Sequence, residues 1–215
     1  TRLRDGSGWG AGGGSGLGTG YDSAFVYSPQ TGQGTEVGRL ANERMWTGGA
    51  LLADGRVLVG GGAGPNTDSA APITAEIYDP GNRTFSPAPN MLAVYHFPLV
   101  FGLPDGQVLT VGGSSERFVD GVWNATSPMN IYRDDAAGTV FPDGRVLVAG
   151  GRDNQSLTSV EIFDPVVDRW TVTAPMAGAR VRHETVLLTD GRVMAIAGTA
   201  GSGALTTTEL LTIGQ

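Results

Sequence analysis

Residues 141–151 read Phe-Pro-Asp-Gly-Arg-Val-Leu-Val-Ala-Gly-Gly, and the chain contains five copies of this pattern of Asp-Gly followed by two small residues. The other copies begin at Asp5, Asp54, Asp105 and Asp190, so successive Asp residues lie 49, 51, 38 and 47 positions apart. Periods of this length are typical of solenoids, propellers and other repeat architectures. We therefore interpret each repeat as one structural unit.

Each unit contains four short apolar runs, which we name strands a to d. Asp-Gly separates strands a and b and predicts a hairpin, because Gly readily adopts the positive φ that primed turns need. Strand c ends in Pro, as in Ala-Glu-Ile-Tyr-Asp-Pro at 75–80, and strand d carries an aromatic residue seven positions after that of strand c, as in Tyr78 and Phe85. With no helical period present, the pattern predicts an all-β propeller of four-stranded antiparallel blades.

The stretches at 103–113 and 141–151, the Glu-Ile-Tyr-Asp-Pro strand and the aromatic residue that follows it resemble the kelch repeat. More narrowly, they are similar to the kelch domain of galactose oxidase and glyoxal oxidase relatives and of secreted bacterial proteins. The resemblance implies a kelch-type β-propeller and an extracellular location. We expect a single domain over 1–215 with about five blades, at 1–43, 44–92, 93–129, 130–176 and 177–215.

The first and last blades are expected to be incomplete. Strand a of the first unit is reduced to residues 1–3, and the last unit stops after strand c at 209–213. Either residues are missing from a longer propeller, or five blades close imperfectly. Thr1 is not preceded by a signal peptide, so the chain is interpreted as a mature form or a fragment.

The amino-acid composition excludes several classes of function. The 215 residues include 35 Gly and carry a net charge of -7, so the chain lacks the basic footprint of a general nucleic-acid-binding protein. It has no Cys, which excludes disulfides, thiolate chemistry and Cys-based metal sites. No apolar stretch approaches the length of a membrane span.

The strand order predicts which face binds. If strand a is innermost, the short a–b and c–d turns lie on one face and the b–c and d–a connections on the other, which we name the loop face. The long, variable b–c connections are Gly8 to Gly20, Gly60 to Pro72, Gly150 to Thr158 and Gly198 to Ala204. Binding residues concentrate on loops that a rigid scaffold holds, so a site is expected there.

Several charges recur from blade to blade. Glu76, Glu116, Glu161 and Glu209 occupy one position of strand c, and Arg56, Arg145 and Arg192 follow Asp-Gly. We predict structural ion pairs or hydrogen bonds for both sets, because a site is asymmetric and buried charges must be paired.

A third recurring set, Arg44, Arg133 and Arg180, lies ten residues before the Asp of each hairpin. Arg binds carboxylate and phosphate through a planar fork, so these residues are candidates for holding an anionic ligand. The resemblance supports this hypothesis, because it implies Arg residues facing the partner in kelch domains that bind acidic peptides. The alternative is that each Arg ties its own d–a loop to backbone carbonyls.

Residues that break the repeat are further candidates, namely Trp46, Tyr95, His96, Arg182 and His183. The Tyr95-His96 pair before a Leu-Pro-Asp-Gly hairpin resembles a copper-ligand pair of galactose oxidase. Three departures oppose copper: the Cys of that family's cofactor is absent, the segment from His96 to Asp105 is one residue longer, and the later domain that supplies another ligand is absent. The alternative is packing and hydrogen bonding, and we expect no catalytic residue, no metal ligand and no cofactor.

The function expected from the sequence is an extracellular binding or structural module for a glycan, an acidic peptide or a neighbouring protein subunit. The recurring Arg set and the five repeat-breaking residues would form its binding surface, with aromatic platforms suited to sugars. The alternative is a portion of a copper-radical oxidase acting on a carbohydrate or aldehyde. A third hypothesis is an architectural subunit whose terminal strands another chain covers. Sequons at Asn82, Asn124 and Asn154 would permit glycosylation in a secreted eukaryotic protein.

Overall fold

The computed structural model describes residues 1–15, 19–64, 73–201 and 203–212, and every helix or strand assigned in them is a β-strand. These residues form two compact units. The first comprises residues 1–110 and 116–125, and the second comprises 111–115 and the residues from Thr126 onward. We describe each unit by itself, and the expectation of a single domain over 1–215 stays a prediction. Among the described residues, no helix is long and apolar enough to cross a membrane.

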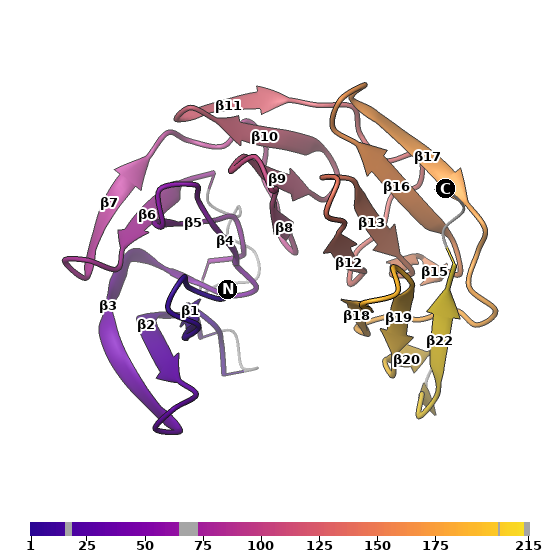
Figure 1. The fold of residues 1–215 in the computed structure, drawn as a ribbon, viewed down its shortest axis with the longest axis horizontal. Coiled ribbons are helices and arrows are strands. Elements are labelled where there is room, and N and C mark those ends of the chain that lie inside the picture. The colour runs from indigo at the N-terminus through magenta and orange to yellow at the C-terminus, as the bar shows by residue number, and fades with distance from the viewer. Residues whose placement is uncertain (16–18, 65–72, 202, 213–215) are drawn as a thin grey trace. The chain divides into compact units, whose positions relative to one another are not determined.

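The first unit contains three antiparallel sheets (Figure 1). Blade 1 consists of β1 (Gly8–Ala11), β2 (Tyr21–Ser28) and β3 (Gln33–Arg44). Blade 2 consists of β4 (Gly48–Leu51), β5 (Val57–Gly60), β6 (Ala75–Asp79) and β7 (Thr84–Ala88). Blade 3 consists of β8 (Leu99–Gly102), β9 (Val108–Val111), β10 (Ser115–Val119) and β11 (Val122–Ala125).

The second unit contains two sheets and two short hairpins (Figure 1). Blade 4 consists of β12 (Ala137–Val140), β13 (Val146–Ala149), β16 (Val160–Asp164) and β17 (Arg169–Thr173). Blade 5 consists of β18 (Glu184–Leu187), β19 (Val193–Ile196) and β22 (Thr208–Leu211). The hairpins are β14 (Arg152–Asp153) with β15 (Gln155–Ser156), and β20 (Thr199–Ala200) with β21 (Gly203–Ala204).

The prediction of an all-β fold with four-stranded antiparallel blades is confirmed, because blades 2, 3 and 4 each hold four strands in chain order across the sheet. The first and last blades have three strands each, as expected. In blade 1 a single bridge from Arg2 to Gly8 stands where strand a would pair. In blade 5, β22 is strand c.

The Asp-Gly hairpins form as predicted, but their turn type differs from the expectation. Gly144 has a φ of +88°, whereas Asp143 is not at positive φ, so the turn is not of the type I′ that Asp-Gly favours. Gly144 N donates to Phe141 O at 2.9 Å, and Phe141 N donates to Arg145 O at 2.8 Å. The left-handed Gly therefore forms a bulge directly after the turn, which is a common arrangement in slightly longer hairpins.

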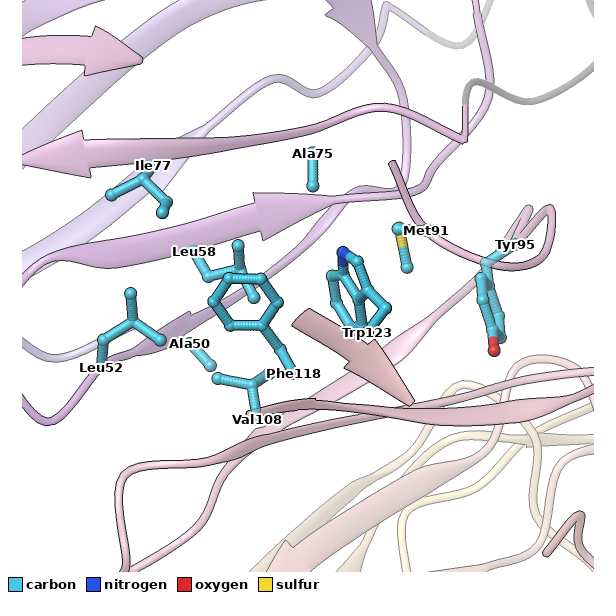
Figure 2. Packing of buried hydrophobic residues seen from close by; sticks show 10 residues of the cluster. All are labelled: Ala50, Leu52, Leu58, Ala75, Ile77, Met91, Tyr95, Val108, Phe118 and Trp123. Carbon is cyan, nitrogen blue, oxygen red and sulfur yellow. The ribbon is translucent and has the colours of Figure 1, made fainter. Parts of the chain in front are cut away.

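Neighbouring blades within each unit pack through apolar side chains. Figure 2 shows the ring of Phe118, from blade 3, lying among Leu52 and Leu58 of blade 2 and Val108 of its own blade. The indole nitrogen of Trp123 donates to Pro89 O at 3.0 Å, so this large side chain is both buried and satisfied. Phe118 and Trp123 lie five positions apart, whereas the predicted seven-residue pairs Tyr78–Phe85 and Phe163–Trp170 are in contact in blades 2 and 4.

The pair of small residues after strand b joins consecutive blades. Gly13 N donates to Arg44 O at 2.8 Å in the first unit, and Gly151 N donates to Arg180 O at 2.8 Å in the second. A Cβ added at Gly151, whose φ is +84°, would lie 2.6 Å from Asp134 O. The motif recurs because backbone of the d–a segments occupies the space where a side chain would be: Asp134 leads into the same blade, and a Cβ at Gly150 would clash with Arg180 O, which leads into the next.

Candidate functional site

A pocket of about 690 Å³ opens on the loop face of the second unit. Two b–c hairpins, β14–β15 and β20–β21, form its walls together with the d–a segment that leads into β18. Its lining residues are Arg152, Asn154, Gln155, Ser156, Ala179, Val181, Arg182, Thr199, Ala200 and Gly201. Among the described residues, the lining contains two arginines and no acidic residue.

Both arginines of this pocket contact one carboxylate. Asp135 Oδ2 lies 3.1 Å from Arg152 Nη2 and 3.2 Å from Arg182 Nε. The Asp135 side chain is 9% exposed, whereas those of Arg152 and Arg182 are 50% and 65% exposed. One largely buried anion thus lies between two solvent-facing cations, which leaves the cluster of these three side chains with a net positive charge.

The backbone fixes this cluster as well. Arg182 N donates to Asp135 O at 2.9 Å, and Asp134 and Arg152 exchange two backbone hydrogen bonds of 2.9 Å. Asp135 and Arg182 both adopt left-handed φ values, of 52° and 53°. Non-Gly residues rarely hold this conformation unless the surrounding structure imposes it. We name this pocket, together with its cluster of Asp135, Arg152 and Arg182, the arginine pocket.

The predicted cluster of Arg44, Arg133 and Arg180 is placed elsewhere, since all three side chains are buried. Arg133 donates to Gly150 O, Ser159 O and Glu161 Oε1 at 2.8, 2.9 and 2.8 Å. Arg44 and Arg180 bind the equivalent Glu76 and Glu209 at 3.4 and 3.0 Å. These contacts agree with the alternative hypothesis, because each Arg binds groups of its own blade. The three arginines are therefore not part of the proposed binding surface.

The other recurring charges are structural, as predicted. Three of the strand c glutamates pair with the arginines just described, and Arg56, Arg145 and Arg192 pair with the Asp of their own hairpins at 2.7 Å each. The fourth glutamate, Glu116, has no arginine at the repeat position.

An aromatic pair lies in the first unit. The rings of Trp46 and Phe97 have centroids 4.8 Å apart, and Trp46 remains 50% exposed. Trp46 holds a φ of 53°, which is uncommon for a bulky residue. It follows Arg44 by two positions, as Asp135 follows Arg133 and Arg182 follows Arg180.

Comparisons with known proteins agree with this architecture. The family described as Kelch motif matches residues 136–177, which include all four strands of blade 4. The structure is similar to the solved structure of YjhT, with a TM-score of 0.80 and 13% identity, over 99% of this chain and 80% of that one. The chain is a kelch-repeat β-propeller.

Curated relatives match about a third of this chain. The influenza virus NS1A-binding protein homolog of Mus musculus is 34% identical over 76 residues, which are 35% of this chain and 12% of the mouse protein. The Homo sapiens influenza virus NS1A-binding protein is 33% identical over 76 residues, again 35% of this chain and 12% of the relative. The matched region is therefore a small part of these proteins.

Tyr95 and His96 do not assemble the copper-ligand pair that the resemblance implied. Tyr95 is buried and its hydroxyl hydrogen-bonds to Glu116, whereas His96 is exposed. Within the described ranges, no group of three or more His, Cys, Asp and Glu residues could hold a metal ion. These residues do not fit a copper-radical centre, and we derive no chemistry through copper.

His183 is separated from the arginine pocket although it follows Arg182 directly. Its ring is 4% exposed, and neither ring nitrogen has a hydrogen-bond partner among the described residues. Burial, together with the nearby charge of Arg180, lowers the pKa of His183 to about 4. The ring is therefore a neutral packing group of the kelch blade near pH 7.

Sequence reasoning missed Asp135, Arg152 and Phe97. Asp135 and Phe97 occupy the position two residues after the recurring Arg or its replacement, so aligning the blades would have found them. Arg152 had no such signal, because the equivalent positions of blades 2 and 5 are Ala63 and Thr199, so no charge recurs there. The connections Gly8 to Gly20, Gly60 to Pro72 and Gly198 to Ala204 lie partly outside the described residues, and Gly8–Ala11 forms β1.

Proposed function

We propose that this kelch propeller is a protein-binding module whose arginine pocket takes an acidic segment of a partner protein. The observation that carries the proposal is the pair of exposed guanidinium groups held in one pocket by Asp135. Three curated relatives are named for binding the NS1A protein, which supports protein binding as the kind of function.

The chemistry of the pocket suits a carboxylate. Each guanidinium presents several N–H donors in a planar fork that matches the two oxygens of Asp or Glu. Asp135 neutralises one of the two charges and reduces the freedom of both side chains, so less entropy is lost when a ligand binds. A pocket of about 690 Å³ accommodates a few side chains of an extended peptide.

The test uses the full chain and an array of 15-residue peptides rich in Asp and Glu, each beside its Asn and Gln counterpart. We expect binding to the acidic member of a pair only, and weaker binding as salt rises. Arg152→Gln and Arg182→Gln should each reduce binding about tenfold, which corresponds to about 1.4 kcal/mol.

Arg145→Gln is the matched control, because Arg145 is a partly exposed arginine paired with a carboxylate on an a–b turn. It should leave peptide binding unchanged. Equal binding of acidic and neutral peptides, or an equal loss in Arg145→Gln, would refute the acidic-segment proposal.

A glycan is the second candidate, and the Trp46–Phe97 pair favours it. An exposed indole offers a flat apolar face of the kind on which a sugar ring can stack. A glycan array probed with the wild-type chain and Trp46→Ala tests this. Binding that survives the substitution would exclude the pair as a sugar platform.

The extracellular location and the neighbouring subunit expected from the sequence belong to the same proposal. Two exposed aromatic residues on β2 of blade 1, Phe25 and Tyr27, support a subunit contact in that unit. Their replacement by Ser should shift a concentration-dependent assembly, measured by sedimentation, toward the monomer.

A further inference from the structure

Blade 3 departs from the charge pattern of the other blades at one buried position. Tyr95 lies ten residues before Asp105, where blades 2, 4 and 5 carry Arg44, Arg133 and Arg180. The glutamate that those arginines neutralise is nevertheless retained as Glu116. A carboxyl group therefore lies in the interior without its repeat cation.

The contacts of Glu116 come from neutral donors. Glu116 is 1% exposed, and its Oε2 accepts a hydrogen bond from Leu92 N at 2.7 Å. The backbone of Ala93 and the hydroxyl of Tyr95 also donate to this carboxyl. All three donors lie in the segment 89–98, which connects β7 to β8.

The titratable and charged groups near this carboxyl are few. Segment 89–98 carries Tyr95 and the exposed His96, and strands β5, β7, β9 and β11 carry none. Glu76 on β6 is paired with Arg44, and Asp79 lies at the far end of that strand. Arg117 follows Glu116 directly, so strand alternation directs it to the opposite face of the sheet.

Glu209, the equivalent residue of blade 5, keeps its arginine and is less buried, with its side chain 18% exposed. Burial opposes its ionisation, but donors from Ala177 N, Arg180 and Gly178 N outweigh burial and lower the pKa of Glu209. For Glu116 the balance is reversed: burial outweighs the hydrogen bonds from Leu92, Tyr95 and Ala93 and raises the pKa. The same side chain in the same repeat position thus shifts in opposite directions.

We propose that Glu116 is a proton-binding position built into blade 3, so that acid strengthens and base weakens the attachment of segment 89–98 to the blade. The structure supports this by replacing the repeat Arg with Tyr95 while keeping the buried carboxyl. Because the folded chain holds this proton more tightly than the unfolded chain, the stabilisation is complete below pH 4.5. It is lost as the pH rises through the pKa of the folded state.

Glu116 is also connected to the surface of the first unit, through the segment that donates hydrogen bonds to it. Segment 89–98 includes Phe97, whose ring packs on the exposed Trp46. Ionisation of Glu116 therefore acts on the segment that holds one half of this aromatic pair.

The experiment is a carbon-detected NMR titration of the glutamate side-chain carboxyls of the full chain, with the Glu116 signal assigned by its loss in Glu116→Gln. We expect Glu116 to titrate above 4.5 and at higher pH than Glu209. Tyr95→Phe removes a donor to the carboxylate and should move the Glu116 midpoint further upward, an effect that packing alone would not produce. A Glu116 midpoint at or below that of Glu209 would overturn the proposal.

Urea unfolding as a function of pH provides a second measurement. Glu116→Gln should lose less stability than the wild type as the pH rises above 4.5, because the neutral amide cannot ionise. Glu209→Gln is the matched control and should keep the wild-type dependence over that range. The same pH dependence in wild type and Glu116→Gln would also contradict the proposal.

Discussion

Blades 2, 4 and 5 each contain two Arg–carboxylate pairs, one on the a–b turn and one in the blade interior, and the two differ in burial and in sequence separation. The a–b turn pairs Arg145 with Asp143, two residues away, at 2.7 Å, with side-chain exposures of 36% and 51%. The blade interior pairs Arg133 with Glu161 at 2.8 Å, and both side chains are 0% exposed. We name these regions the turn and the junction.

The comparison shows that burial, rather than the pairing itself, decides how strongly a charged pair affects the free energy of unfolding. An exposed pair gains little because water and salt screen it and because side-chain entropy is lost. In the junction, removal of one partner leaves the other charge in a medium where it cannot be solvated. The junction also joins blades, since Gly151 N of blade 4 donates to Arg180 O in the segment that leads into blade 5.

The largest effect is expected from Glu161→Gln in the junction of blade 4. Glu161 accepts from Asn130 N, Ile131 N and Arg133 Nη2. Its replacement leaves the buried guanidinium without a counter-charge and weakens the hydrogen bonds to the loop at 130–131. We expect a loss of about 3–5 kcal/mol in the free energy of unfolding, measured by urea denaturation at pH 7. A loss under about 1 kcal/mol would mean that the junction is no different from the turn.

Two glycines with the same backbone conformation sharpen the comparison. Gly151 and Gly191 both have a φ of +84°, but a Cβ at Gly151 would lie 2.6 Å from Asp134 O, whereas one at Gly191 meets nothing within 4 Å. Gly191→Ala should cost only the left-handed conformation, about 1–2 kcal/mol. Gly151→Ala should cost about 3 kcal/mol or more, because the clash adds to that strain. Equal losses in urea denaturation would show that the junction backbone relaxes.

Acid should weaken the junction of the second unit through His183. Its pKa in the folded chain is about 4, below the ordinary 6.5, so the folded state binds fewer protons than the unfolded state. Stability is full above pH 6.5 and is lost as the pH falls through 4, by on the order of 2–3 kcal/mol.

His183→Gln should flatten that dependence when thermal unfolding is followed from pH 7 to pH 4. His96→Gln is the control, because His96 is exposed, and it should keep the wild-type profile. A profile unchanged in His183→Gln would contradict the assignment of the acid effect to this ring.

The smallest effect is expected in the turn. Asp143→Asn removes one charge but keeps an acceptor for Arg145 N, so the hairpin retains its backbone hydrogen bond. The free energy of unfolding should change by less than about 1 kcal/mol, and less again at 1 M salt. A loss comparable with that of Glu161→Gln would remove the distinction between turn and junction.

The sequence predicted most of the fold and part of the candidate site. Asp-Gly, Gly-Gly and Asp-Pro are local signals, and their spacing was enough to predict blades and strand order. Arg182 and Trp46, which break the repeat, are exposed. Tyr95 and His183 also break it, yet they are buried, since a departure from a repeat does not reveal which way a side chain points.

By itself, the sequence determined the repeat of strands a to d, their order and the positions where charges recur, because these depend on turn chemistry and on alternation over a few residues. Only the tertiary structure decided the partners: Glu161 meets Arg133 across 28 residues, and Asp135 joins Arg152 to Arg182. Such contacts depend on how strands far apart in the chain pack and on how much water they exclude. Burial therefore separates the arginines that hold the blades from those that face a partner.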